Sequence, residues 1–232
     1  MEKTIGILQP GYLPWLGFFD QVYSCDVFIL YDDVQFDKYG WRNRNKIKTQ
    51  DGEHWLTVPV LHKGLGKQLI KDVKINYTEN WVVKHIKSIT QNYSKTPFFK
   101  EYSIDIFNCL NKKYIYLSDL TTELIYVLCK FLKIETSIVR SSTLKLEGDR
   151  IQRLIQCIKY FNGNKFIEGT AGKDYICKEV FDKNGIKVIY QDYKHPEYRQ
   201  LYSSFVCNLS VIDLIFNCGP NSLLILNNQN TL

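Results

Sequence analysis

The order of strand-like and helix-like patterns in the first 31 residues constrains the fold most strongly. The apolar run Thr4–Leu8 stops at Gln9-Pro10-Gly11, which is typical of a buried strand that ends in a loop. Pro14 then stands where a first-turn proline would, and apolar residues recur at helical spacing from Leu16 to about Ser24. A second uninterrupted apolar run, Val27–Tyr31, follows. The pattern predicts a βαβ opening whose first loop lies where α/β sheets place ligands.

The rest of the chain predicts further α/β alternation around an inserted region. Residues 41–48 and 54–60 flank an Asp-Gly turn signal and predict a β-hairpin. We expect a short strand at 70–75 and then helices at 79–92, 97–110 and 114–132. Strands are expected at 137–140, 165–168 and 187–190, and helices at 149–161, 174–184 and 209–217. The predicted fold class is therefore α/β: a Rossmann-like three-layer sheet with a β-hairpin and a helical insertion.

No repeat and no Pro/Ser-rich linker divides the 232 residues, so we predict one composite domain over residues 1–232. Its parts are a βαβ unit plus hairpin (1–78), the helical insertion (79–133), a second α/β part (134–220) and a tail (221–232) that we expect to fray. No apolar run approaches the ~18–20 residues that span a bilayer, and the amino terminus lacks a signal-peptide pattern. These features predict a cytoplasmic protein without membrane insertion.

Charge and composition narrow the function classes. Thirty Lys and Arg against 24 Asp and Glu give a net charge of +6, which suits an anionic small molecule, a nucleotide or an acidic surface. The basic residues are scattered, with no run of five, so we expect no nucleic-acid partner. Aromatic residues make up 14% of the chain, and 16 of them are tyrosines. Rings in polar surroundings are typical of surfaces that bind sugars and nucleobases.

The seven cysteines are odd in number and never have the spacing of a zinc site. The four histidines add no metal-binding motif. We interpret the cysteines as reduced core residues and predict no structural metal.

The first loop, Gln9 to Gly17, holds two prolines and two glycines that fix its shape. Gln9 and Tyr12 supply polar ends, and Trp15 supplies a flat face. One interpretation is a ligand loop in which N–H groups at a helix start face an anion. The alternative is a tight strand–helix connection whose aromatic side chains simply pack.

The second loop contains the adjacent carboxylates Asp32 and Asp33, followed by Gln35. Neighbouring carboxylates repel one another unless a cation, an amine or backbone donors offset the charge. They could therefore bind a substrate ammonium or a divalent ion coordinated to phosphate. The alternative is a turn whose carboxylates face solvent.

A basic segment begins the first predicted hairpin strand. Because alternate residues of a strand share a face, its cations would line one side and its amides the other. Arginine suits phosphate geometry, so this segment is a candidate pyrophosphate clamp; the alternative is an exposed strand face. The residues are Trp41, Arg42, Asn43, Arg44, Asn45 and Lys46.

A third polar loop follows the predicted strand at 187–190. Only His195 among the histidines stands in such a polar-aromatic loop, where a base with a pKa near neutrality could reach a substrate. Tyr198 and Gln200 follow in the same loop. The alternative is a structural histidine. The loop at Gly169 could cradle a phosphate, but it lacks the spacing of a known phosphate motif.

Motifs along nearly the whole chain resemble the WbqC-like family. Glu168, before Gly169, and Cys207 depart from the pattern expected of that family. The runs that carry the resemblance are Gln9-Pro10-x-Tyr12-x-Pro14-Trp15-x-Gly17-Phe18-Phe19, Asp26-Val27-Phe28, Tyr31-Asp32-Asp33-Val34-Gln35-Phe36, Gly40-Trp41-x-Asn43-Arg44-Asn45, Trp55-Leu56-Thr57-Val58-Pro59-Val60, His195-Pro196-x-Tyr198-x-Gln200, Phe205, Leu209-Ser210-x-x-Asp213-Leu214, Phe216-Asn217 and Gly219.

This resemblance implies a role in bacterial surface-polysaccharide synthesis, such as the O-antigen of lipopolysaccharide. It implies as substrate an amino sugar carried on dTDP or UDP, and as reaction an N-acyl or aminoacyl transfer to the sugar's amine. An acyl or aminoacyl donor would be the second partner, with acyl-CoA or ATP and Mg²⁺ as candidate cofactors. A homodimer is left open.

The resulting hypothesis gives each motif a role. Arg44 and the first-loop N–H groups bind phosphate, either Asp32 or Asp33 orients the amine, and His195 removes its proton. Two alternatives stay open: an ATP-dependent ligase or nucleotidyltransferase of the same pathway, and a non-catalytic sugar-nucleotide-binding or assembly protein. The residues expected to bind substrate are Gln9, Tyr12, Trp15, Gln35, Trp41, Asn43, Arg44, Tyr198 and Gln200.

Overall fold

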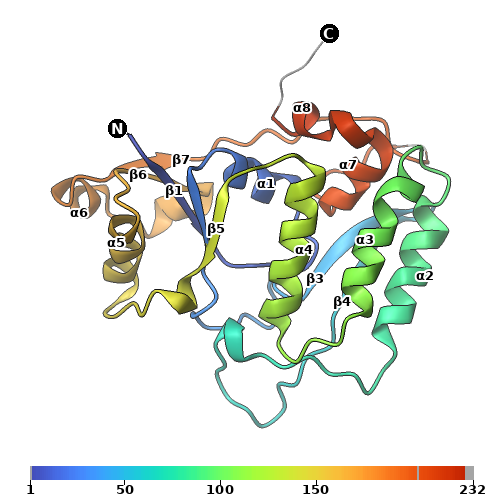
Figure 1. The fold of residues 1–232 in the computed structure, drawn as a ribbon, viewed down its shortest axis with the longest axis horizontal. Coiled ribbons are helices and arrows are strands. Elements are labelled where there is room, and N and C mark those ends of the chain that lie inside the picture. Colours follow the sequence, from blue (N-terminus) through green and yellow to red (C-terminus); the bar gives the residue numbers. More distant parts are fainter. Residues whose placement is uncertain (1, 203, 228–232) are drawn as a thin grey trace.

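A parallel five-stranded sheet organises the protein (Figure 1). The structure, a computed structural model, describes residues 2–202 and 204–227. The strands lie in the order β5-β2-β1-β6-β7. Their bounds are β1 (Thr4–Leu8), β2 (Val27–Leu30), β5 (Ser137–Arg140), β6 (Lys165–Glu168) and β7 (Lys187–Tyr190). When the five parallel strands are numbered 1 to 5 in chain order, their order in the sheet is 3-2-1-4-5, as in doubly wound folds. The prediction of a Rossmann-like α/β fold is confirmed.

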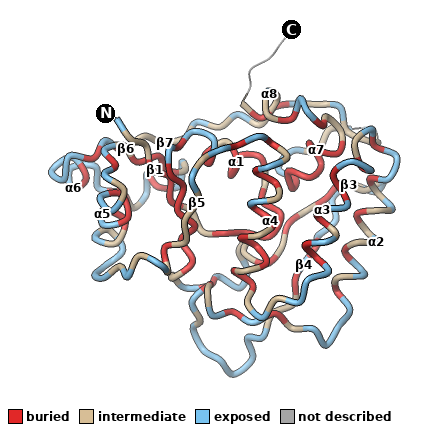
Figure 2. The backbone as a smooth tube through the Cα atoms, in the orientation of Figure 1, coloured by how far each residue is buried: buried red, intermediate tan, exposed pale blue. Residues whose placement is uncertain are grey.

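Helices cover both faces of the sheet and complete three layers. Because successive side chains of a strand point to opposite faces, Phe28 and Leu30 belong to one core cluster, and Val27 and Ile29 to the other. The first cluster contains residues of α1 (Leu16–Tyr23), α4 (Leu117–Phe131) and α7 (Val211–Cys218). The second contains residues of α5 (Arg150–Tyr160) and α6 (Lys178–Lys183). Buried residues accordingly concentrate in the central strands β1, β2 and β6 and in the helices α1, α4 and α7 (Figure 2).

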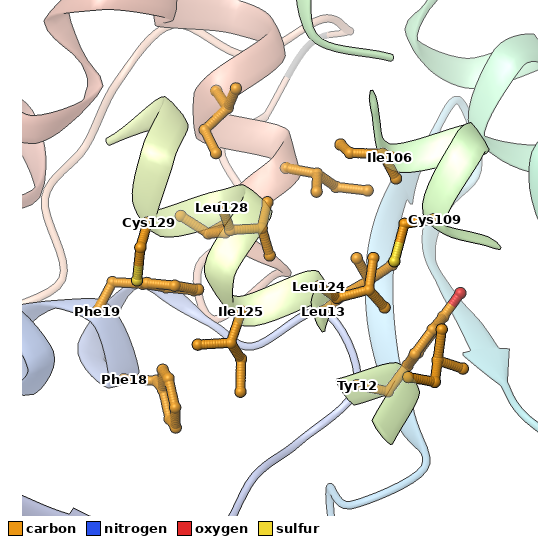
Figure 3. Close-up of a cluster of buried hydrophobic side chains, with 14 of the residues drawn as sticks. Tyr12, Leu13, Phe18, Phe19, Ile106, Cys109, Leu124, Ile125, Leu128 and Cys129 are labelled. Carbon is orange, nitrogen blue, oxygen red and sulfur yellow. The ribbon is translucent and has the colours of Figure 1, made fainter. Parts of the chain in front are cut away.

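The segment between β2 and β5 forms the predicted hairpin and helical insertion. The hairpin consists of β3 (Arg44–Thr49) and β4 (Gly52–Thr57), which pair antiparallel. The helices are α2 (Trp81–Tyr93), α3 (Phe99–Asn111) and α4, which stand together beside the sheet (Figure 1). Figure 3 shows α1 meeting this insertion, where Phe18 and Phe19 face α4. The inserted helices therefore share a core with the sheet.

Three local predictions were wrong. Residues Ile70–Asp72, expected in a strand, form a 3-10 helix. The backbone of this segment and its neighbours makes single hydrogen bonds and isolated bridges to several segments and does not pair along one strand. The helix expected from 174 starts only at Lys178, since Thr170–Asp174 forms a 3-10 turn first. The tail was expected to fray from 221, but a 3-10 turn (Gly219–Asn221) and α8 (Ser222–Leu226) continue the chain. The fully buried Leu226 anchors α8; residues 228–232 lie outside the described part.

No helix in residues 2–202 and 204–227 is long and apolar enough to cross a membrane. The cytoplasmic location stays a prediction. All seven cysteines are free; four are buried, as interpreted, whereas Cys177 and Cys207 are exposed and Cys218 is half-buried. The described residues contain no group of three or more His, Cys, Asp or Glu side chains placed to hold a metal ion.

Candidate functional site

Two adjoining cavities open at the carboxyl end of β1, beside the point between β1 and β6 where the strand order reverses. In open α/β sheets this switch point is the usual place for a ligand. The two share Leu8, Gln9 and Arg42. The polar cavity, of about 640 Å³, is lined by Ile7, Leu8, Gln9, Tyr31, Asp33, Val34, Gln35, Arg42, Arg150, Arg153, Leu154, Glu168, Gly169, Ala171 and Tyr175. The aromatic cavity, of about 390 Å³, is lined by Leu8, Gln9, Gly11, Pro14, Trp15, Phe18, Trp41, Arg42, Asn45 and Asn208.

The first turn of α5 supplies two of the three arginines of the polar cavity. Arg153 donates to the Tyr31 hydroxyl at 3.1 Å, and its Nη2 lies 2.6 Å from Asp33 Oδ2. The guanidinium of Arg150 lies 3.5 Å from the centre of the Tyr175 ring. Asp149 caps this helix with a reciprocal capping box, which fixes the turn that carries both arginines. With three arginines against two carboxylates, the cavity suits an anionic ligand.

Glu168, the last residue of β6, places a buried carboxylate in the polar cavity. It is 5% exposed, and its Oε1 accepts a hydrogen bond from the Gly169 N–H at 3.0 Å. Burial raises the pKa of Glu168, while the hydrogen bonds from Gly169 and Tyr175 and the charge of Arg150 act in the opposite direction. A Cβ at Gly172 would lie 2.2 Å from the Glu168 Cγ, so glycine is needed where the following turn closes over this side chain.

Arg42, at the junction of the two cavities, is a half-buried cation. Its Nη1 donates to the Gln9 carbonyl at 3.2 Å, and its own carbonyl accepts the Tyr12 N–H at 3.0 Å. Its Nε is buried and has no hydrogen-bond partner among the described residues. No carboxylate of the described residues forms an ion pair with Arg42. Burial lowers the pKa of Arg42, and Asp37 offsets part of this effect. A buried cation without a counter-ion is unfavourable, which points to an anionic ligand here.

The aromatic cavity has flat walls and three side-chain amides, those of Gln9, Asn45 and Asn208. The ring of Trp15 lies against Gly17, where a Cβ would meet the ring at 2.3 Å, and Tyr193 packs edge-on against it at 5.5 Å between centroids. Trp41 stacks at a tilt on Trp55, 5.0 Å away between centroids. Such walls fit a planar or apolar group.

The first loop, which separates the cavities, is held in a strained shape. Leu13 has a φ of 46°, in the left-handed region that favours glycine, although its side chain is fully buried. The side-chain amide of Asn45 donates to the Leu13 carbonyl at 2.6 Å, and the Val211 N–H donates to the Pro14 carbonyl at 2.9 Å. Residues held in this way by their surroundings are concentrated at ligand sites.

Comparisons with known proteins place this geometry in a family. The model of the WbqC-like protein family matches residues 9–225. The chain belongs to the WbqC-like family. It is 35% identical to the uncharacterized protein Rv1507c of Mycobacterium tuberculosis over 224 residues, which cover 95% of this chain and 96% of that protein. No solved structure matches the chain. Membership of the WbqC-like family supports a role in polysaccharide biosynthesis and nothing finer.

The cavities bring together seven of the residues that the sequence suggested, among them Arg42, which lines both cavities, and Asn45, which lines the aromatic cavity. Gln9 lines both cavities, Trp15 and Trp41 line the aromatic cavity, and Asp33 and Gln35 line the polar cavity. They come from three separate segments that meet only because β1 and β2 are neighbours and the hairpin folds back on the first loop.

Asp32 and Asp33 have different roles, although they are adjacent. Asp32 is fully buried; it accepts hydrogen bonds from Arg140 Nε at 2.6 Å and from the Ser142 N–H at 3.0 Å, which ties the end of β2 to the end of β5. Asp33 pairs with Arg153 at the cavity. The repulsion expected between the two carboxylates is therefore offset by two different arginines of the chain.

Tyr12, Asn43 and Arg44 line neither cavity. Tyr12 is fully buried, and its hydroxyl lies 2.9 Å from Nδ1 of His85. Asn43 donates to the Val58 carbonyl inside the hairpin at 2.9 Å. Arg44 lies on the outer hairpin face, with its guanidinium 4.6 Å from the centre of the Trp55 ring.

The residues of the third polar loop also lie apart from both cavities. His195 packs among Tyr193, Tyr198 and Phe205, with Nδ1 at 2.9 Å from the Pro196 carbonyl, and burial lowers its pKa. Tyr198 donates to Asp213 at 2.9 Å. Gln200 bonds both backbone polar atoms of Val206, so it shapes the loop itself.

Sequence reasoning missed four cavity residues: Arg150, Arg153, Glu168 and Tyr175. Arg150 and Arg153 stand three apart at the start of a predicted helix, and Glu168 ends a predicted strand. The sequence places these residues at the ends of predicted elements, but only the strand order shows that they converge on one cavity.

Proposed function

We propose that the protein binds a nucleotide-linked amino sugar across the two cavities and transfers an acyl or aminoacyl group to the sugar's amine. The observation that carries the proposal is Arg42, a half-buried cation at the junction of the cavities, whose Nε is buried and whose guanidinium has no carboxylate partner among the described residues. A diphosphate placed there would be the anion that this guanidinium lacks, since arginine binds phosphate oxygens through charge-assisted hydrogen bonds.

The chemistry of each cavity sets the orientation of this ligand. The nucleobase fits the aromatic cavity, where Trp15 and Trp41 offer ring faces and Asn208 offers an amide. The sugar fits the polar cavity, where Gln9, Asp33 and Tyr175 offer partners for hydroxyl and amino groups. The family's link to polysaccharide biosynthesis supports a sugar substrate.

Replacing Arg42 tests the placement of the phosphates. We expect Arg42→Gln to weaken binding of UDP or dTDP at least tenfold, because a charge-assisted hydrogen bond to a desolvated anion contributes about 1.5–3 kcal/mol. Binding of the uncharged nucleoside should change much less. Isothermal titration calorimetry at fixed ionic strength measures both, and a melting curve checks that the variant is folded.

Arg44→Gln is the matched control, because Arg44 is two residues away but lies on the outer hairpin face. We expect its UDP affinity to stay within twofold of the wild type. If Arg44→Gln weakens binding and Arg42→Gln does not, the diphosphate binds on the outer face of the hairpin, and the proposed orientation is wrong.

Mass spectrometry tests the reaction itself. The purified protein is incubated with nucleotide-linked amino sugars, with and without acyl-CoA, amino acids, ATP and Mg²⁺. A mass increase on the sugar establishes the transfer, and a requirement for ATP identifies the ligase alternative. Tight binding with no product from any donor supports the non-catalytic alternative.

A further inference from the structure

Glu168 places a buried carboxylate in the polar cavity, and none of the proposed contacts with the sugar involves it. We propose that Glu168 is the catalytic base that takes the proton from the sugar's amine as the amine attacks the acyl carbon. This inference rests on the proposed function, because it takes the amino sugar to occupy the polar cavity.

The position of Glu168 meets the geometric requirement for a base. It ends β6, the strand next to β1 across the switch point, so its carboxylate stands at the cavity beside the first loop. Oε1 is oriented by the Gly169 N–H at 3.0 Å, and Gly172 packs against the side chain. A carboxylate held in this way has a fixed direction, as proton transfer requires.

Other titratable groups are less suited to this step. Asp33 shares the cavity, but its carboxylate is already engaged in an ion pair with Arg153 at 2.6 Å. His195 lines neither cavity. Glu168 has no ion pair of this kind among the described residues.

The surroundings of Glu168 favour its role as a base. Burial raises its pKa from the ordinary glutamate value, which makes the carboxylate a better proton acceptor. The Tyr175 hydroxyl acts to lower the pKa of this carboxylate, and Arg150 lies over the Tyr175 ring. The charged and titratable groups around it are Arg150 and Arg153 of α5, Tyr175, Asp33, Arg42 and Tyr190 of β7.

The step balances with an acyl thioester as donor. The amine nitrogen forms a bond to the acyl carbon, and the bond from that carbon to sulfur breaks, so the thiolate leaves with the electron pair. The proton on nitrogen passes to the Glu168 carboxylate. Glu168 then gives that proton to the thiolate or to water and returns to its charged form.

Glu168→Gln tests this role directly. We expect turnover to fall about 10²–10⁴-fold, the usual contribution of a general base, while the affinity for the nucleotide sugar stays within tenfold. Glu147→Gln is the matched control, because Glu147 is exposed and lines neither cavity. It should keep wild-type turnover. A Glu168→Gln enzyme that retains more than a tenth of wild-type turnover overturns the proposal.

Tyr175→Phe tests the base by its pH profile. Tyr175 is a positioning residue, and its hydroxyl favours the charged form of Glu168. Removing the hydroxyl should raise the pKa of Glu168 and move the acid limb of kcat/KM to higher pH. An acid limb that does not move in this variant, or one that persists in Glu168→Gln, contradicts the assignment.

A binding comparison needs no turnover and separates this inference from the proposed function. If Glu168 faces the amine, replacing it should change the affinity for the nucleotide-linked amino sugar at least threefold more than the affinity for the analogue with a hydroxyl at that position. Equal changes overturn the role of Glu168 even if the protein binds nucleotide sugars. Failure of the wild-type protein to bind either ligand overturns the proposed function and this inference with it.

Discussion

Asp32→Ala should lower the free energy of unfolding by about 3–5 kcal/mol, the usual effect of removing one partner of a buried ion pair. The Asp32 carboxylate is fully buried and accepts hydrogen bonds from Arg140 and from the N–H and hydroxyl of Ser142. Alanine would leave the Ser142 N–H without its acceptor and remove the link between the ends of β2 and β5. Urea unfolding of the two proteins measures the difference.

Asp119→Ala is the matched control, because Asp119 binds the same arginine from the surface. Its carboxylate lies 2.7 Å from Arg140 Nη1, and its side chain is 42% exposed. An exposed ion pair contributes about 0–1 kcal/mol, so this variant should lose no more than that. Similar losses in Asp32→Ala and Asp119→Ala would show that burial of Asp32 does not determine the stability of the network.

Asp213 should make stability fall as the pH rises. It lies within α7 and accepts hydrogen bonds from Tyr93 and Tyr198, both at 2.9 Å. Burial raises its pKa from 3.8 to about 6, despite these bonds and the charge of Lys48. Between these two values the unfolded chain has lost the proton and the folded chain still holds it. The folded state is therefore favoured below pH 4 and loses this advantage as the pH rises through 6.

The measurement compares wild type with Asp213→Asn, whose side chain does not titrate. The free energy of unfolding of the wild type relative to the variant should fall by an amount on the order of 2–3 kcal/mol between pH 4 and pH 7. Asp182→Asn, on an exposed position of α6, is the control. A difference between wild type and Asp213→Asn that is constant with pH would contradict the predicted effect of burial.

The strands of the sheet could be predicted because their signal is local. β5, β6 and β7 have the predicted bounds, since short apolar runs bounded by turn residues are typical of buried parallel strands. The 3-10 helix at Ile70–Asp72 could not be predicted, because its backbone bonds to several distant segments that the sequence does not reveal.

The candidate site could be predicted only in part, because it depends on the order of the strands. Gln9 and Asp33 stand at the ends of the first two strands, which the βαβ pattern already made neighbours. Glu168 became a candidate only when β6 proved to pair with β1. His195 stands in a loop whose composition is typical of catalytic loops. The structure packs it against Tyr193 and Phe205, and the local sequence does not predict these contacts.

The shared guanidinium of Arg42 has a consequence for ligand discovery. Two separate small molecules, each carrying an anionic group, would compete for Arg42 even when their remaining atoms occupy different cavities. A single molecule with one central anion and two arms would avoid that competition, because binding of the first arm gives the second a high effective concentration. Compounds that join an arm for each cavity through one anion should therefore bind this protein far more tightly than mixtures of their halves.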